Sequence, residues 1–244
     1  MDLSTANQLV ELNRQFYQTF ARSFSATRQR LQPGVWRIVE ELPAGAAVLD
    51  LGCGNGELGR VLLGRGHTAG YTGVDFAPAL LDARRESAGA PPGTLEFVEA
   101  DLAAPGWQAA LPGRRFAVIT LFAVLHHLPG AAARQALLDG AGQLLLPGGR
   151  LELSCWQFLN SPRLRQRIQP WQAAGIDPAT VDPGDYLLDW RQDGAGLRYV
   201  HHFDDQELTG LAAAAGFQVS RRFHADGEGG QLSIYHTWQR LGPE

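Results

Sequence analysis

A glycine-rich turn at residues 52–56 constrains this chain more than any other part of its sequence. The apolar residues 46–51 before it predict a short buried strand, and the apolar spacing over 58–62 predicts a helix after it. A strand, a tight glycine turn and a helix form the opening of a β-α-β unit. Glycines there let the backbone approach a ligand closely, because no Cβ atom intervenes. The sequence therefore predicts a ligand site at this turn.

Acidic residues around the turn indicate the charge of that ligand. A dinucleotide-binding turn has its third glycine where Glu57 stands here, counting from Gly52. Glu57 would place a carboxylate at the helix N-terminus, where a pyrophosphate has to bind, and Asp50 adds another at the strand end. Two acids disfavour a phosphate and favour a ligand that carries a cationic ammonium group.

Alternating strand and helix patterns follow the turn and predict a parallel, doubly wound sheet. The predicted strands cover 46–51, 71–75, 95–99, 116–121, 150–156, 217–223 and 231–239, and the predicted helices cover 57–65, 78–87, 129–145 and 204–215. The last helix is expected to start at an N-cap, Asp204, and to end at Gly216. Residues 157–203 break this rhythm with polar, proline-rich and aromatic sequence, and a connection of that length indicates a functional segment.

The N-terminal residues have a helical pattern. Apolar residues recur at helical spacing over 4–24, and a second short helix is expected near 35–42. We therefore expect a single domain, 1–244, in which residues 1–44 form an N-terminal helical cap and residues 157–203 form a substrate-recognition insertion.

Charge and cysteine content argue against some classes of function. The formal net charge is −4 at pH 7, so no global basic field indicates nucleic-acid binding, although a local patch would suffice for it. Cys53 and Cys155 lack the spacing of metal ligands, and no metal site is predicted. The first residues lack the apolar segment of a signal peptide, and no apolar run is long enough to span a membrane. We therefore expect a cytoplasmic protein without a membrane partner.

The turn and the strands behind it resemble a known family. Asp50, Gly52, Gly54 and Gly56 stand in the pattern D-x-G-x-G-x-G, which resembles the first motif of class I S-adenosylmethionine-dependent methyltransferases. The resemblance implies S-adenosyl-L-methionine as the cofactor. It also implies an α/β, Rossmann-like fold with a seven-stranded, mostly parallel sheet whose seventh strand is antiparallel. An N-terminal helical cap and an insertion after strand five complete that fold.

The same resemblance assigns cofactor contacts. Asp75 ends the second strand at a spacing from Gly54 close to that of an acid that binds a ribose diol, and Asp101 stands where the family contacts the adenine amine. The implied cofactor residues are Tyr17, Arg28, Asp50, Gly52, Gly54, Asn55, Asp75, Phe76, Asp101, Leu102 and Leu121. Structural roles stay open for some of them: Asp75 as a helix N-cap, Asp101 as a turn residue and Phe76 as part of the core. Arg28 belongs either to a lid over the cofactor or to a solvated helix end.

Five further stretches resemble one branch of the family, the tRNA wobble carboxymethyluridine methyltransferases. They are Phe24-Ser25-Ala26-Thr27-Arg28, Ala123-Val124-Leu125-His126-His127, Leu146-Pro147-Gly148-Gly149 followed by Trp156, Asp185-Tyr186-Leu187-Leu188-Asp189-Trp190, and Arg198-Tyr199-Val200-His201-His202-Phe203. The chain departs from that branch where Asp189 replaces a proline and where His201 and His202 are doubled. Eukaryotic members of the branch need a small activating subunit, so such a subunit is a candidate partner beside the methyl acceptor.

Arg198, His201 and His202 are the candidate catalytic residues. An arginine can bind a carboxylate through two parallel hydrogen bonds and so fix the attacking oxygen toward the methyl group. Alternation along an extended segment places Arg198 with His202 on one face, whereas the family motif favours His201, and both alternatives stay open. The competing interpretation is that Arg198 pairs with a nearby acid and holds the insertion together. The acids concerned are Asp185, Asp189 and Asp193.

The predicted function is methyl transfer from S-adenosylmethionine to a carboxylate, and the resemblance favours one on a modified tRNA wobble uridine as the acceptor. A carboxylate is ionised at neutral pH and needs no general base, so alignment is the main requirement. The basic run of the insertion contains only Arg163, Arg165 and Arg167, which is little for binding tRNA. The acidic net charge favours the alternative, a small-molecule O- or N-methyltransferase. A non-catalytic, cofactor-binding regulator is the third interpretation.

Overall fold

The computed structural model describes residues 1–26, 30–77, 94–191 and 194–241, so the predicted helix at 78–87 and Arg28 lie outside the described residues. Its main element is a seven-stranded sheet in the order β3-β2-β1-β4-β5-β10-β9. The strands from β1 to β5 pair in parallel, whereas β10 pairs antiparallel with both β5 and β9. The predicted Rossmann-like sheet with an antiparallel final strand is confirmed.

The strand bounds follow the predicted ones closely, except at β5. The strands of this sheet are β1 (Val48–Leu51), β2 (Tyr71–Asp75), β3 (Leu95–Glu99), β4 (Phe116–Phe122), β5 (Leu145–Trp156), β9 (Phe217–Ala225) and β10 (Ser233–Arg240). β5 begins five residues before the predicted strand, because Leu145 already pairs with Phe116 of β4. A bulge separates this pair from the next one, Val118 with Arg150. All residues of β1 and β2 are buried, as expected for parallel strands that are covered on both faces.

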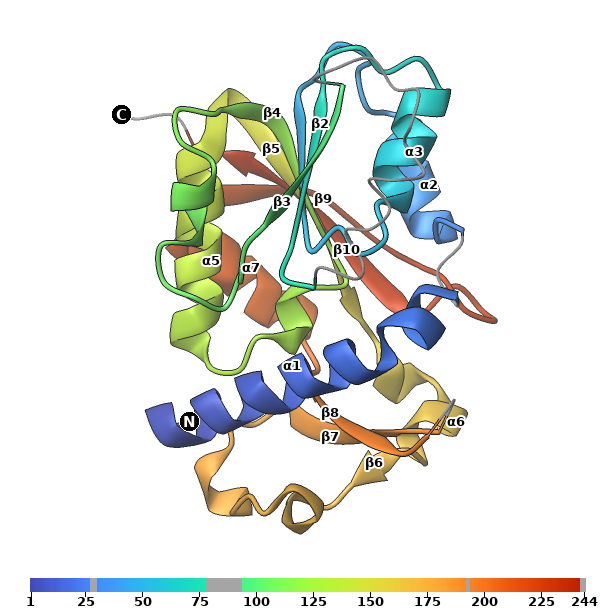
Figure 1. Ribbon diagram of the computed structural model, residues 1–244, viewed down its shortest axis with the longest axis vertical. Helices are drawn as coiled ribbons and strands as arrows, with labels where there is room; N and C mark the ends of the chain where they lie inside the picture. Colours follow the sequence, from blue (N-terminus) through green and yellow to red (C-terminus); the bar gives the residue numbers. More distant parts are fainter. Residues whose placement is uncertain (27–29, 78–93, 192–193, 242–244) are drawn as a thin grey trace.

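Helices cover both faces of the sheet (Figure 1). α2 (Pro33–Val39) and α3 (Glu57–Gly64) lie on one face, and α5 (Ala131–Leu144) and α7 (Asp205–Ala214) lie on the other. Each face has its own apolar cluster, which includes Val35 on the first and Leu137 on the second. The predicted N-cap of the last helix is confirmed, because the Asp204 side chain accepts a hydrogen bond of 2.7 Å from the backbone amide of Glu207. The short helices η2 (Trp107–Ala110) and η3 (Leu125–His127) flank β4.

Residues 157–203 contain a second, antiparallel sheet that the sequence did not predict. Its strands are β6 (Ile168–Gln169), β7 (Asp185–Trp190) and β8 (Gly196–His201), and the short helices η4 (Phe158–Asn160), α6 (Pro162–Arg165), η5 (Trp171–Ala174) and η6 (Pro178–Thr180) precede β7. β6 is only two residues long, and prolines punctuate the segment before β7, so no alternating pattern of useful length exists there.

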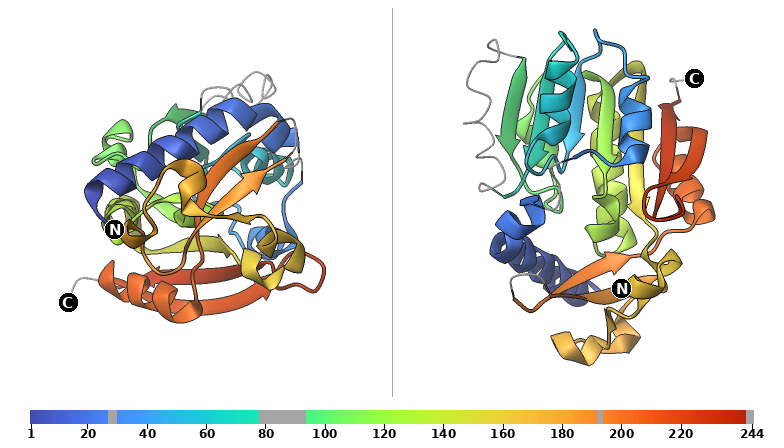
Figure 2. Two further views of the ribbon diagram at one scale, coloured as in Figure 1. Left: turned by 90° about the horizontal axis from the view of Figure 1, so that it is seen from below. Right: turned by 90° about the vertical axis from the view of Figure 1, so that its right-hand side faces the viewer.

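The N-terminal helix α1 (Leu3–Ala26) packs on this second sheet and lies between it and the main sheet (Figures 1 and 2). Leu9 packs with Ile176 and Tyr199, and Phe16 packs against Trp190. Two segments that are far apart in the sequence thus form one structural unit. We call α1 together with β6, β7 and β8 the lid.

Candidate active site

A cavity of about 460 Å³ lies at the carboxyl ends of the parallel strands, between the main sheet and the lid. Its wall is formed by the glycine turn after β1, the segments after β2, β3 and β4, the end of β5, and parts of α1, α2 and β8. Open α/β sheets bind their ligands at this edge. The cavity therefore lies where the glycine turn predicted a ligand.

The backbone and its neighbours dictate the glycines of the turn. Gly52 has a φ of 72°, and a Cβ atom added to it would lie 2.3 Å from a methyl carbon of Val124. Its amide donates a hydrogen bond of 2.8 Å to the carbonyl of Val74, which ties the turn to β2. Gly54 lines the cavity, and its amide donates to the carboxylate of Asp75 over 2.9 Å. The turn is therefore both fixed and open toward a ligand.

Asp50 places a buried carboxylate in the wall of the cavity. Its oxygens accept hydrogen bonds of 2.6 Å from the hydroxyl of Tyr71 and of 2.6 Å from that of Thr120. Burial raises the pKa of Asp50 to about 6, although the two hydrogen bonds act in the opposite direction. A cationic group of a ligand would favour the ionised form and reverse this shift.

Two further acids line the same side of the cavity. Asp75 is buried, accepts a second hydrogen bond of 3.0 Å from the amide of Ala77, and has its pKa raised by burial. Asp101 is about one-third exposed; one oxygen accepts from the amide of Ala103 at 2.9 Å and the other from the guanidinium of Arg14 at 2.5 Å. The acids at the ends of three neighbouring strands thus converge on one cavity.

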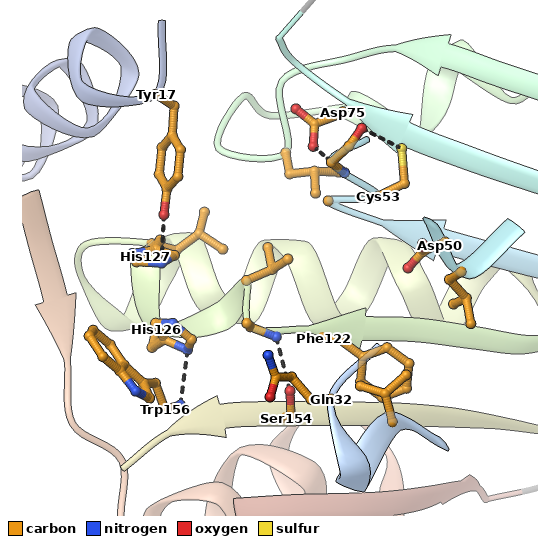
Figure 3. A pocket seen from close by; sticks show the side chains of 18 of the residues that line it. Tyr17, Gln32, Asp50, Cys53, Asp75, Phe122, His126, His127, Ser154 and Trp156 are labelled. Atoms are coloured by element: carbon orange, nitrogen blue, oxygen red, sulfur yellow. Dashed lines mark hydrogen bonds between the residues drawn. The ribbon is translucent and has the colours of Figure 1, made fainter. Parts of the chain in front are cut away.

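Tyr17 of α1 closes the cavity from the lid side (Figure 3). Its hydroxyl lies 2.7 Å from Nε2 of His127, and Nδ1 of that ring lies 3.2 Å from the backbone carbonyl of Tyr199. A carbonyl can only accept, so Nδ1 of His127 carries the proton and Nε2 accepts from Tyr17. The Tyr17 ring also meets Phe76 edge-on, with 6.3 Å between the ring centres. Tyr17 is therefore oriented by contacts with both the core and the residue after Asp75.

Arg198 of β8 lines the cavity beside Trp156 at the end of β5, among aromatic rings. Its guanidinium carbon is 4.8 Å from the ring centre of Trp156, 5.5 Å from that of Phe16 and 5.8 Å from that of Trp190. The side chain is buried, and His126 packs beside Trp156, whose amide lies 3.3 Å from Nδ1 of His126. A cationic group in such aromatic surroundings is weakly hydrated and suited to binding a carboxylate.

Residues 23–221 match the protein family described as "Methyltransferase domain". The chain belongs to this family. It is 34% identical over 142 residues to tRNA (carboxymethyluridine(34)-5-O)-methyltransferase ALKBH8 of Macaca fascicularis. The matched region covers 58% of this chain and 19% of that protein. It is 37% identical over 131 residues to trans-aconitate 2-methyltransferase of Streptomyces avermitilis, which covers 52% of this chain and 45% of that protein.

A crystal structure of a SAM-dependent methyltransferase from Methanosarcina mazei has the same fold, with a TM-score of 0.65 and 21% sequence identity over 86% of this chain and 98% of that one. The chain spans less than half the length of the two curated relatives. The family and the fold that the sequence predicted are confirmed: this chain is a methyltransferase with a class I fold.

The predicted cofactor residues of this methyltransferase mostly line the cavity. They are Tyr17, Asp50, Gly52, Gly54, Asn55, Asp75, Phe76, Asp101 and Leu102. Leu121 differs, because alternation along β4 turns its side chain into the fully buried core, and Phe122 and Ala123 line the cavity in its place. Arg28 is outside the described residues.

The structure does not bring His201 and His202 to the cavity of the methyltransferase; of the three candidate catalytic residues, all within the described ranges, only Arg198 lines it. The ring of His201 lies between two carboxylates, 2.6 Å from Asp185 and 3.0 Å from Glu207. Burial alone would lower the pKa of His201, but these hydrogen bonds outweigh burial and raise it. His202 lies edge-on to the ring of Phe158. The prediction of a catalytic histidine on this segment rested on proximity to Arg198, on alternation along an extended segment and on the family motif, and the structure places both rings away from the cavity.

The acids that were expected to compete for Arg198 have other partners in the described residues. Asp185 accepts a hydrogen bond of 2.6 Å from the hydroxyl of Tyr199 in addition to its contact with His201. Asp189 pairs with Arg191 at 2.6 Å, and the third acid, at position 193, lies outside the described residues. Two of the three acids thus have other partners, and the interpretation of Arg198 as a staple of the insertion stays open.

Sequence reasoning missed several residues that line the cavity. Asn13 and Arg14 lie one helical turn before Tyr17 on the same face of α1, so helical spacing from Tyr17 was an available signal. Asp226 and Tyr235 come from the final hairpin, where Asp226 has a φ of 68° and accepts a hydrogen bond of 2.6 Å from the Tyr235 hydroxyl. No local pattern indicated that this hairpin reaches the cavity.

Candidate sites for a metal ion and candidate membrane-spanning helices are absent from the described part of the chain. No group of three or more histidine, cysteine, aspartate or glutamate side chains there could hold a metal ion. None of the helices in those same residues combines the length and the apolar character needed to cross a bilayer.

Proposed function

We propose that this methyltransferase transfers a methyl group from S-adenosylmethionine to a carboxylate oxygen of an acceptor bound by Arg198. The observation that carries the proposal is the arrangement of charge in one cavity, with three acids at the ends of β1, β2 and β3 and a buried arginine beside Trp156 at the end of β5. The acids suit a ligand with an ammonium group and hydroxyl and amine donors. The arginine suits an anion.

The cofactor is S-adenosylmethionine, which carries a group complementary to each of the three acids. Asp50 faces the ammonium group, Asp75 the ribose hydroxyls and Asp101 the adenine amine. Charge supports this assignment, because Asp50 keeps a raised pKa without a cationic partner. The backbone amide of Gly54 holds Asp75 in place, so the ribose site is organised in advance.

The surroundings of Arg198 support carboxylate chemistry. Arg198 offers a planar fork of donors that matches a carboxylate, and its aromatic surroundings keep water away from that contact. An ionised carboxylate needs no proton removed before it attacks the methyl group, so the chain has to supply alignment and dehydration only. The names of both curated relatives include a carboxyl-bearing acceptor, carboxymethyluridine in one and trans-aconitate in the other.

Two acceptor classes share this chemistry: a carboxymethyl group on a tRNA wobble uridine and a small carboxylic acid. The first agrees with the ALKBH8 relative, and the second with the aconitate relative and with the net charge of −4. A regulator without activity is the least supported, because the acids and Arg198 line one and the same cavity, which offers a place for an acceptor.

The test uses methyl-labelled S-adenosylmethionine with total tRNA and, separately, with a small-molecule extract. A carboxyl methyl ester releases labelled methanol in mild alkali, whereas an N-methyl or ether product keeps its label. Arg198→Lys keeps the charge but loses the fork, so turnover should fall at least tenfold while cofactor affinity stays unchanged.

Arg191→Lys is the matched control, because Arg191 is an exposed arginine directly after β7 that pairs with Asp189. It should behave as wild type. An alkali-stable product, or normal turnover in Arg198→Lys, would contradict the carboxylate assignment.

A further inference from the structure

Arg14 is a charged residue on the cavity wall whose role neither the sequence motifs nor the family match assigns. It lies on the face of α1 that also carries Asn13 and Tyr17, and all three line the cavity. Its guanidinium donates to one oxygen of Asp101 at 2.5 Å, while the other oxygen of Asp101 accepts from the amide of Ala103 at 2.9 Å. A hydrogen bond to each of its two oxygens thus fixes the orientation of the Asp101 carboxylate.

This ion pair joins the lid to the main sheet. α1 is tied to β8 within the lid, because the Asn13 side chain accepts from the amide of Tyr199 at 2.8 Å and donates to its carbonyl at 3.1 Å. Asp101, by contrast, belongs to the segment that follows β3 of the main sheet. The Arg14–Asp101 contact therefore joins the two parts of the molecule at the wall of the cavity, beside the proposed cofactor site.

The geometry leaves Asp101 able to accept from a ligand as well. Each carboxylate oxygen has two lone pairs, and the amide and the guanidinium use one on each oxygen. Arg14 and Asp101 are about one-third to two-fifths exposed, so water and salt weaken their pairing as long as the cavity is open. A bound purine that displaces this water would strengthen the pair.

We infer that Arg14 is a positioning residue for cofactor recognition. It orients Asp101 toward the adenine amine, and it links the binding of adenine to the packing of α1 against the main sheet. The inference rests on the proposed function, because it takes the adenine of the cofactor as the group that meets Asp101. It predicts that loss of Arg14 weakens binding of an adenine ligand more than binding of a purine that lacks the amine.

The first experiment is calorimetry with two probes, S-adenosylhomocysteine and S-inosylhomocysteine, which carries an oxygen in place of the amine. Arg14→Gln should weaken S-adenosylhomocysteine binding about three- to tenfold, the scale of one hydrogen bond, and leave S-inosylhomocysteine binding nearly unchanged. Glu11→Gln is the control, because it removes the second, exposed ion-pair partner of Arg14 and leaves Asp101 untouched. An unchanged or increased affinity in Arg14→Gln, with an unchanged melting temperature, would overturn the inference.

The second experiment exchanges the two charges, Arg14→Asp with Asp101→Arg. The restored ion pair should return the hydrogen exchange of α1 to the wild-type rate, while the preference for S-adenosylhomocysteine over S-inosylhomocysteine stays lost, because an arginine cannot accept from the amine. A preference that survives the exchange would contradict the role of Asp101 and Arg14. If the wild-type protein binds neither probe, the proposed function fails first, and that outcome is distinct from failure of this inference.

Discussion

At the scale of a single residue, the buried carboxyl group of Asp50 makes the free energy of unfolding depend on pH. Its pKa is raised from 3.8 to about 6 by burial, so the folded protein holds this proton more tightly than the unfolded chain does. The resulting contribution to the free energy of unfolding is full below about pH 4 and is lost as the pH rises through about 6, a change on the order of 3 kcal/mol. Without a cation beside it, an ionised Asp50 therefore destabilises the fold.

A ligand that carries an ammonium group should bind more tightly when Asp50 is ionised. We predict that the affinity for S-adenosylhomocysteine rises between pH 5 and pH 7, by up to about tenfold per unit below pH 6, and levels off above it. Calorimetry in two buffers of different ionisation enthalpy measures the proton released on binding. Asp50→Asn should bind more weakly and show a flat profile. A flat profile in the wild-type protein would remove Asp50 from the ammonium site.

At the scale of elements, α1 is the part of the lid that should respond most to the cofactor. Its polar contacts at the cavity include the hydrogen bond of 2.7 Å from Tyr17 to His127 of η3 and the ion pair of Arg14 with Asp101 after β3. Polar contacts beside water open easily, so amide hydrogens of α1 should exchange more slowly once a ligand dries the cavity. α7, on the far side of the sheet from α2 and α3, provides the internal control.

We predict that S-adenosylhomocysteine slows hydrogen exchange in residues 9–20 and leaves α7 unchanged. Asn13→Ala should speed exchange in α1 of the free protein, because the Asn13 side chain makes two hydrogen bonds with Tyr199 and a third, of 3.0 Å, with the carbonyl of His127. Mass spectrometry of peptic fragments measures both effects. Equal exchange with and without ligand would leave α1 as a static wall of the cavity.

On the scale of the whole molecule, a buried charge cluster joins the lid to α5 and α7. Both ring nitrogens of His201 face carboxylate oxygens, of Asp185 and Glu207, which can only accept, so both nitrogens donate and the ring is protonated. The guanidinium of Arg134 completes the cluster, 2.7 Å from the hydroxyl of Tyr199 and 3.6 Å from Glu207. Four charged side chains and the neutral hydroxyl of Tyr199, from four elements, thus meet in one place.

The raised pKa of His201 sets the sign of its pH dependence. Its stabilising contribution is full below the ordinary histidine value of 6.5 and is lost as the pH rises through the raised one. We predict that His201→Gln lowers the free energy of unfolding by about 1–3 kcal/mol at pH 6, the scale of hydrogen bonds to a charged group, and by less at pH 9. His224→Gln changes an exposed histidine and should have little effect at either pH. Urea unfolding measures both variants, and a His201→Gln deficit that stays constant with pH would contradict a protonated ring.

The parts of this molecule that were predictable are those with local causes. β1, the glycine turn and α3 follow from apolar periodicity and from backbone geometry at Gly52, and the cavity acids follow because each comes at or just after the end of a strand. The cluster around His201 was not predictable, since Arg134 and Glu207 reach it from separate helices. The lid sheet was not predicted, because β6 has only two residues and prolines interrupt the segment before β7.

The shared packing of α1 and β8 has a consequence for engineering. The obvious way to give this protein a new methyl acceptor is to replace residues 157–203 alone, as one contiguous segment. The Asn13 side chain, however, makes two hydrogen bonds with the backbone of Tyr199, and the ring of Phe16 packs against Arg198. The first helix is therefore part of the same structural unit. The exchangeable unit is a pair of segments from two separate stretches of the chain, which have to be grafted together.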